Sequence, residues 1–83
     1  MDINKEVLHV LDEVLSLGGR GLAFERSTPL LGAVPELDST AVVVLIGALE
    51  ERLGIVVADD EIDGSMFEDV GALVDFVQAR VDA

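Results

Sequence analysis

Cysteine is absent from the 83 residues, so the chain can form neither a disulfide bond nor a thiolate metal site. Basic residues are scarce as well: five lysines and arginines stand against 17 acids, which gives a net charge of -12 at pH 7. A surface of this sign repels a phosphate backbone, and this excludes nucleic acid as a partner. The 12 acids and two bases of residues 36–83 would instead attract basic protein surfaces.

Long apolar runs are also missing. The longest, residues 41–49, covers nine residues, whereas a spanning helix needs about 20, so we expect no membrane insertion. The first six residues lack the basic flank and the apolar segment of a secretory signal, and we therefore expect a cytoplasmic protein.

Apolar residues nevertheless make up 51% of the chain and the mean hydropathy is +0.51, which argues against disorder. A chain of this length buries roughly 8,000 Å² on folding, which is enough for one core. We therefore predict a single domain over residues 1–83, and a monomer.

Apolar residues at helical spacing predict three main helices. The first spans about residues 3–17 and ends at Gly18 and Gly19. The second spans residues 38–53, although its valines also favour strands. The third begins near Glu68 and Asp69. The predicted inward residues are Leu45, Ile46, Leu49 and Leu53 of the second helix, and Val70, Leu73, Val74, Val77 and Val81 of the third.

Two connections complete the prediction. About 20 residues precede the second helix, and we expect them to be ordered by their apolar side chains, which are Leu22, Phe24, Leu30, Leu31 and Val34. After the second helix, residues 55–57 should dock on the core as an extended loop, and a short helix should run through residues 60–67. The expected fold class is all-α: a small four-helix bundle of three main helices and one short helix, with a long ordered loop between helices one and two.

Ser39 is a weak candidate for a hydrolase nucleophile. The single histidine, His9, falls among the polar positions of the first helix, where we expect it to be solvated. Residues 37–41 also lack the glycines of a nucleophile elbow. Both observations exclude the hydrolase interpretation.

An acidic stretch after the second helix resembles the start of an EF-hand loop, with Asp59, Glu61, Asp63 and Gly64 at its first, third, fifth and sixth positions. The twelfth position, where a bidentate glutamate should close the shell, is Val70. This excludes a calcium sensor. It leaves two alternatives, a solvated acidic turn or a weak divalent-cation site at Asp59, Glu61 and Asp63.

The order of the remaining features is more specific. An amphipathic helix and a long loop lead to Leu37, Asp38 and Ser39 at the start of the second helix; Ala48-Leu49-Glu50-Glu51, the acidic stretch and a closing helix follow. In this order the sequence resembles the acyl carrier proteins over nearly its whole length. From the residues alone a second interpretation stays open: an unmodified small acidic helical protein-interaction module, in which Ser39 merely caps a helix.

The resemblance implies a carrier rather than an enzyme. Ser39 would receive a 4'-phosphopantetheine arm from coenzyme A, added by a magnesium-dependent phosphopantetheinyl transferase, and Asp38 is the acid of the motif. The thiol of the arm would hold an acyl or aminoacyl group as a thioester. Further implied partners are an acyl- or aminoacyl-loading ligase and a downstream acyltransferase or condensing enzyme.

The second helix departs from the usual family pattern. Thr40 replaces an apolar residue, and the valines 42–44 stand where fatty-acid carriers tend to show acids. The resemblance therefore points to a specialised pathway, such as exopolysaccharide, exosortase-associated or polyketide synthesis, or amino-acid loading. We predict a partner-docking face that starts apolar near the serine and ends acidic. Its residues are Thr40, Val44, Gly47, Ala48, Glu50 and Glu51.

Overall fold

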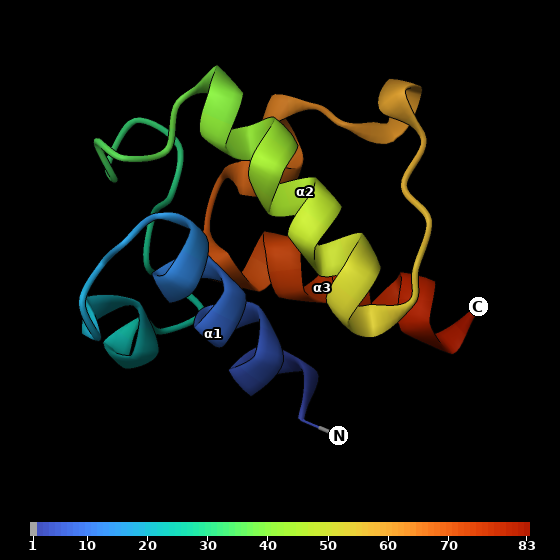
Figure 1. The fold of residues 1–83 in the computed structure, drawn as a ribbon, viewed down its shortest axis with the longest axis horizontal. Coiled ribbons are helices and arrows are strands. Elements are labelled where there is room, and N and C mark those ends of the chain that lie inside the picture. The colour runs from blue at the N-terminus through green and yellow to red at the C-terminus, as the bar shows by residue number, and fades with distance from the viewer. Residues whose placement is uncertain (1) are drawn as a thin grey trace.

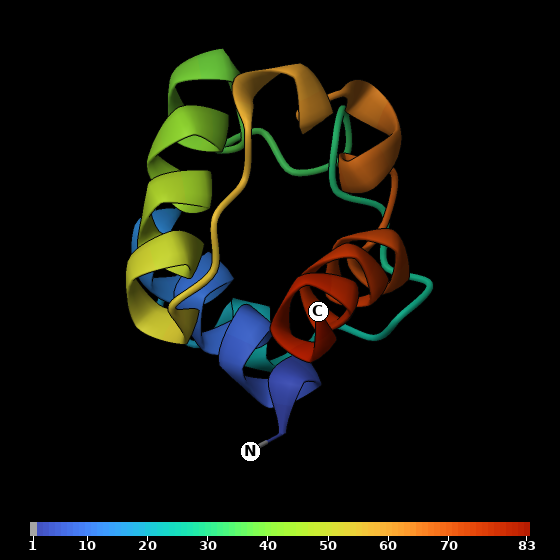
Figure 2. The same cartoon turned by 90° about the vertical axis from the view of Figure 1, so that its right-hand side faces the viewer.

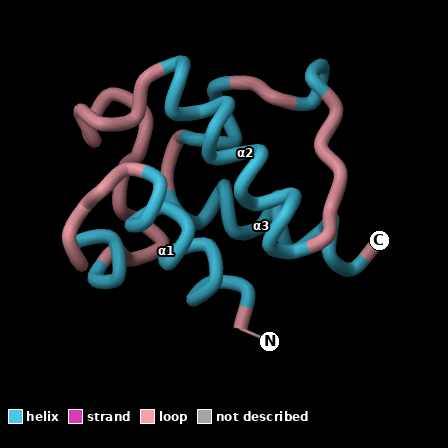
Figure 3. The backbone as a smooth tube through the Cα atoms, viewed as in Figure 1, coloured by secondary structure: helices cyan, strands magenta, loops and turns pink. Residues whose placement is uncertain are grey.

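The computed structural model describes residues 2–83, which form three α-helices and three short 3-10 turns without a β-strand (Figure 1, Figure 3). The helices are α1 (Ile3–Val14), α2 (Ser39–Leu53) and α3 (Val70–Asp82). The turns are η1 (Arg20–Ala23), η2 (Asp59–Glu61) and η3 (Gly64–Phe67). The all-α prediction is confirmed, and α2 agrees with its predicted range to within one residue.

Each α-helix begins after an aspartate whose carboxylate accepts a hydrogen bond from the backbone N–H three residues on, which satisfies one of the unpaired amides of the first turn. These bonds run from Lys5 to Asp2 (3.2 Å), from Ala41 to Asp38 (2.8 Å) and from Ala72 to Asp69 (2.8 Å). Because the caps are local, the three starting points follow from short stretches of sequence.

The three helices enclose one hydrophobic core, and Figure 2 shows them around the region that its side chains fill. The fully buried members include Val7, Leu11, Leu30, Leu45, Leu49, Phe67, Val70, Leu73 and Val77. Residues 55–57 dock as predicted, since Ile55 and Val57 are buried while Val56 between them is exposed. Within residues 2–83, no helix has the length and apolar character needed to cross a membrane.

The predicted end of the first helix is wrong: α1 stops at Val14, because Ser16 takes a left-handed conformation (φ 53°). The turn brings the next loop back onto the helix, where Asp12 Oδ1 accepts hydrogen bonds from the N–H groups of Gly19 (2.9 Å) and Gly21 (3.0 Å). Gly21 lies so close that a Cβ there would meet the Asp12 Cβ at 2.9 Å. A helix continued to residue 17 would carry these amides away from Asp12.

The connection before α2 is ordered, but not by all the residues we expected. Leu30 and Val34 are buried and Phe24 is partly buried, whereas Leu22 and Leu31 are about half exposed. The turn η1 within this connection has no counterpart in the prediction.

The short fourth helix predicted through residues 60–67 is two 3-10 turns, η2 and η3. Ile62 and Asp63 between them are extended, because the Asp63 carboxylate caps η3 by accepting the Ser65 N–H (2.9 Å). Farther on, Val81 was expected to point inward but is 37% exposed, since the last turn of α3 extends beyond the core.

Candidate functional site

Ser39 is the first residue of α2 and is exposed. The capping hydrogen bond is made by Asp38, whose Oδ1 accepts the Ala41 N–H at 2.8 Å. The serine hydroxyl is therefore not needed to cap the helix. Backbone N–H groups of the first turn and the positive end of the helix dipole lie beside this hydroxyl, which favours a negatively charged substituent on it.

A cavity of about 320 Å³ opens beside Ser39. Its wall comes from the loop before α2, from α2 itself and from the η2–η3 region, which lie at the same end of the molecule (Figure 1, Figure 2). The other lining residues are Leu31, Val42, Ile62, Asp63, Gly64 and Phe67. The wall is thus mainly apolar, with no basic side chain among its residues.

Backbone hydrogen bonds fix two sides of this cavity to each other. The loop segment 26–31 runs antiparallel to residues 67–71, with one isolated β-bridge between Pro29 and Asp69. The bonds join Leu31 N–H to Phe67 O (2.9 Å), Leu30 N–H to Glu68 O (3.2 Å), Val70 N–H to Thr28 O (3.0 Å) and Gly71 N–H to Arg26 O (2.9 Å). Leu31 and Phe67 therefore hold their places in the cavity wall as one unit.

Asp63 provides the one charged side chain in the cavity lining. Its Oδ1 accepts hydrogen bonds from the Ser65 hydroxyl (2.5 Å) and the Ser65 N–H (2.9 Å). These bonds, led by that of the hydroxyl, stabilise the carboxylate and lower the pKa of Asp63 below its ordinary 3.8. The cavity edge is therefore anionic at neutral pH.

The predicted docking residues of α2 lie mostly on one exposed surface. Thr40, Val44, Gly47 and Glu51 are exposed, and Ala48 is partly buried. We call these five residues the α2 face. Two valines here are open to solvent, since Val44 is 53% exposed and its neighbour Val43 is 68% exposed. Val43 is not among the docking residues predicted from the sequence, although its place one helical turn before Gly47 sets it next to this face.

Glu50 differs from the other predicted docking residues because a hydrogen bond within the protein engages its carboxylate. It is partly buried, and its Oε2 accepts a hydrogen bond from the Val57 N–H at 2.9 Å. This bond ties the chain after α2 to the end of that helix. The acidic end of the α2 face is therefore Glu51.

The carboxylates of the acidic turn, Asp59, Glu61 and Asp63, do not converge on one site. Glu61 forms an ion pair with Arg80 and accepts the Ala58 N–H (3.0 Å), while Asp63 is bonded to Ser65. Across residues 2–83, no three metal-binding side chains come together as a group that could hold an ion. The structure thus favours a solvated acidic turn over the weak divalent-cation site at Asp59, Glu61 and Asp63.

His9 is partly buried on α1 rather than fully solvated as we expected. It does not line the cavity beside Ser39. The arrangement around Ser39 therefore offers an accessible hydroxyl and an apolar wall, and no imidazole base lines it.

A comparison with solved structures agrees with this geometry. No protein-family profile matches the chain, and neither does any curated protein sequence. A holo acyl carrier protein from Nitrosomonas europaea, whose structure was solved in solution by NMR, is similar over 100% of both chains. The two share 43% sequence identity and superimpose with a TM-score of 0.91. This identity over the full length, together with the common fold, places the chain in the acyl carrier protein family.

Proposed function

We propose that the chain carries an acyl or aminoacyl group as a thioester on a 4'-phosphopantetheine arm joined to Ser39, and that it delivers this group to the enzymes of a biosynthetic pathway. The observation that supports this most is the exposed Ser39 at the start of α2, with the capping done by Asp38 and an apolar cavity alongside. The holo state of the similar protein from Nitrosomonas europaea adds support.

The residues around Ser39 suit such an arm. In the first turn of α2, the amides of Ala41 and Val42 are already paired with Asp38, which leaves those of Ser39 and Thr40 at the helix terminus. These amides and the helix dipole favour the charge of a phosphodiester on the serine. When bound, the arm supplies the thiol that a chain without cysteine lacks.

The cavity supports an apolar cargo. Leu31, Val42 and Phe67 offer a wall against which an acyl chain or the apolar part of the arm can lie. Asp63 at its edge favours a cargo that is neutral or bears an amine and disfavours one that ends in a carboxylate, since like charges repel. Both alternatives, acyl and aminoacyl, are compatible with this wall.

The proposed partners are a phosphopantetheinyl transferase, a loading ligase and a downstream acyltransferase or condensing enzyme. Residues 1–83 would act toward them as a single carrier domain, as a monomer and in the cytoplasm. The α2 face offers them apolar contact at Val44 and Gly47, and Glu51 for a basic residue. Such a charge mainly accelerates encounter and sets specificity. The exposed valines also suit the alternative function, an unmodified interaction module.

One measurement separates the two functions. The purified protein is incubated with coenzyme A, magnesium and a broad-specificity phosphopantetheinyl transferase, and its intact mass is recorded. We expect the wild type to gain one phosphopantetheine group, Ser39→Ala to gain none, and Ser27→Ala, which changes another exposed serine, to behave as wild type. Labelling retained by Ser39→Ala, or a wild type that several transferases leave unchanged, would overturn the carrier proposal.

A further inference from the structure

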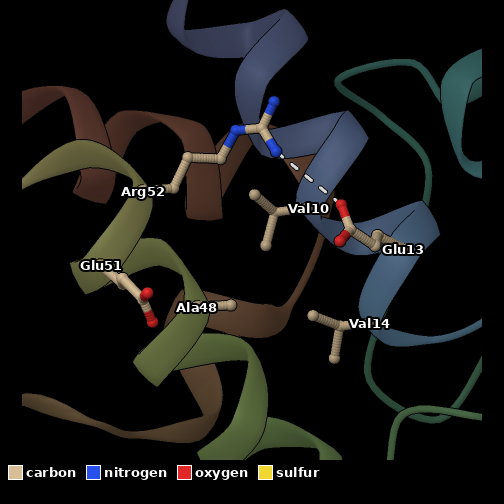
Figure 4. Close-up of a pocket in the computed structure, with 6 residues that line it drawn as sticks. All are labelled: Val10, Glu13, Val14, Ala48, Glu51 and Arg52. Carbon is tan, nitrogen blue, oxygen red and sulfur yellow. Dashed lines mark ion pairs between the residues drawn. The ribbon is translucent and has the colours of Figure 1, made fainter.

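A second cavity, of about 280 Å³, lies between α1 and α2, away from the residues that line the cavity at Ser39. Each helix contributes three residues at the same spacing, i, i+3 and i+4, so that two short rows face each other (Figure 4). The rows are Val10, Glu13 and Val14 of α1, and Ala48, Glu51 and Arg52 of α2. We call this cavity the α1–α2 groove.

The groove combines an apolar floor with a charged rim. Val10, Val14 and Ala48 point into the space between the helices, and Glu13, Glu51 and Arg52 carry the charged ends around it (Figure 4). This pattern fits a long basic side chain, because lysine and arginine lay an aliphatic stem on apolar surface and keep the charged head in water.

The charge on the rim is not balanced. Arg52 pairs through Nε with Glu6 at 2.9 Å, and its Nη1 lies 3.8 Å from a Glu13 oxygen. The side chain of Glu13 remains 78% exposed, so the pair with Arg52 is a weak one. Glu51 is exposed at the rim as well. Two carboxylates are therefore available to an incoming cation.

The groove is continuous with the α2 face, since Ala48 and Glu51 belong to both. Glu51 lies twelve residues after Ser39, which is about 18 Å along the helix axis. A standard protein interface covers about 800 Å² on each partner, or a patch about 30 Å across. One enzyme footprint can therefore hold both the serine and the groove.

We propose that the α1–α2 groove receives an arginine or lysine side chain of the transferase that modifies Ser39. The stem of that side chain packs on Val14 and Ala48, and its charged head lies between Glu13 and Glu51. This inference rests on the proposed function and extends the docking surface from α2 onto α1.

A second copy of the chain does not suit the groove. Four of the five basic residues, the arginines at 20, 26, 52 and 80, each form an ion pair within residues 2–83, so a second copy would have Lys5 alone to offer as an unpaired cation. A net charge of -12 on each copy opposes self-association. The occupant therefore comes from a basic partner.

The test is steady-state transfer from coenzyme A by a broad-specificity phosphopantetheinyl transferase, with the carrier as varied substrate. The double variant Glu13→Gln/Glu51→Gln should raise KM about fivefold or more while kcat changes less than twofold, because the lost contacts act in docking. The control is Glu25→Gln/Asp82→Asn, which removes two exposed charges outside the groove and should change KM less than twofold.

A variant that is expected to change KM in the opposite direction makes the test more specific. Arg52→Gln frees Glu13 and should lower KM, whereas Arg26→Gln, which breaks an exposed pair with Asp75, should not. Melting curves check that every variant is folded. Equal changes of KM in the two double variants would mean that total charge, not the groove, sets KM, and would overturn the inference. A higher KM for folded Arg52→Gln would overturn it as well. A wild type that accepts no arm would remove the proposed function, and the inference with it.

Discussion

Asp38 and Ser39 stand side by side at the start of α2, and they should contribute very differently to stability. The Asp38 carboxylate accepts the Ala41 N–H at 2.8 Å, whereas Ser39 is the first helical residue and is exposed. Replacing an N-cap aspartate by alanine costs about 1 kcal/mol, with a range of about 0.5 to 2. For a domain of this size that lowers the melting temperature by about 4 to 8 °C.

We therefore expect Asp38→Ala to lower the melting temperature by this amount and Ser39→Ala to leave the free energy of unfolding within about 0.5 kcal/mol of wild type. Asp38→Asn removes the charge but keeps an oxygen acceptor, so it should lose only a few tenths of a kcal/mol. Asp69→Ala at the start of α3 is the matched positive control, because its cap has the same 2.8 Å geometry.

The assay is thermal and urea denaturation followed by far-ultraviolet circular dichroism. The reasoning fails if Ser39→Ala loses as much stability as Asp38→Ala, since the serine would then be the cap. It also fails if Asp38→Asn loses as much as Asp38→Ala, because charge rather than capping would then dominate. A stable Ser39→Ala protein is also what makes this variant a clean control for modification.

Four further predictions test the helix faces and the acidic region. A Cβ at Gly47 would meet no atom within 4 Å, so Gly47→Ala should raise the free energy of unfolding by about 0.5 to 1 kcal/mol in urea; a loss would contradict this. The hydrogen bonds from Ser65 lower the pKa of Asp63 below 3.8, so the destabilisation by Asp63→Ala should be complete at neutral pH and shrink as the pH falls through that lowered value. Melting curves across pH check this, and a difference that grows in acid would refute it. Sodium and magnesium chloride at matched ionic strength should raise the melting temperature equally, because no three carboxylates of residues 59–63 come together as a group that could hold an ion; an extra gain with magnesium would support the weak divalent-cation site instead. Val44 is 53% exposed, so Val44→Glu should fold normally yet slow acyl transfer by the natural partner, and unchanged kinetics would reject the docking face.

The helices were predictable because their signals are local. An aspartate followed three residues later by an amide it can cap, and apolar residues at helical spacing, suffice to place α2 and the start of α3. The Leu37, Asp38 and Ser39 motif likewise needs no tertiary information. For the same reason the sequence identified the serine but left open whether Ser39 is a modification site or merely the helix cap, since serine can fill the capping role by type.

The end of α1 and the two 3-10 turns were not predictable in the same way. At Ser16 the chain adopts a positive φ that only a few per cent of non-glycine residues take, although Gly18 and Gly19 stand just two and three residues later. Asp12 stabilises this early end of the helix, because its carboxylate accepts hydrogen bonds from the backbone N–H groups of Gly19 and Gly21, seven and nine residues later. These two hydrogen bonds depend on how the loop folds back onto α1, which residue type alone does not indicate.

The cavity beside Ser39 depends on contacts that sequence periodicity cannot report. Its two fixed sides, Leu31 and Phe67, belong to segments without regular repeats, and backbone hydrogen bonds between those segments hold them together. Backbone bonds place few demands on side-chain identity, so they leave little trace in the sequence. Leu31 illustrates the consequence: as an apolar residue in a loop it was expected in the core, yet it is half exposed and lines the wall beside the serine. An apolar side chain that the core leaves at the surface, next to an exposed hydroxyl, therefore marks this site better than either residue does alone.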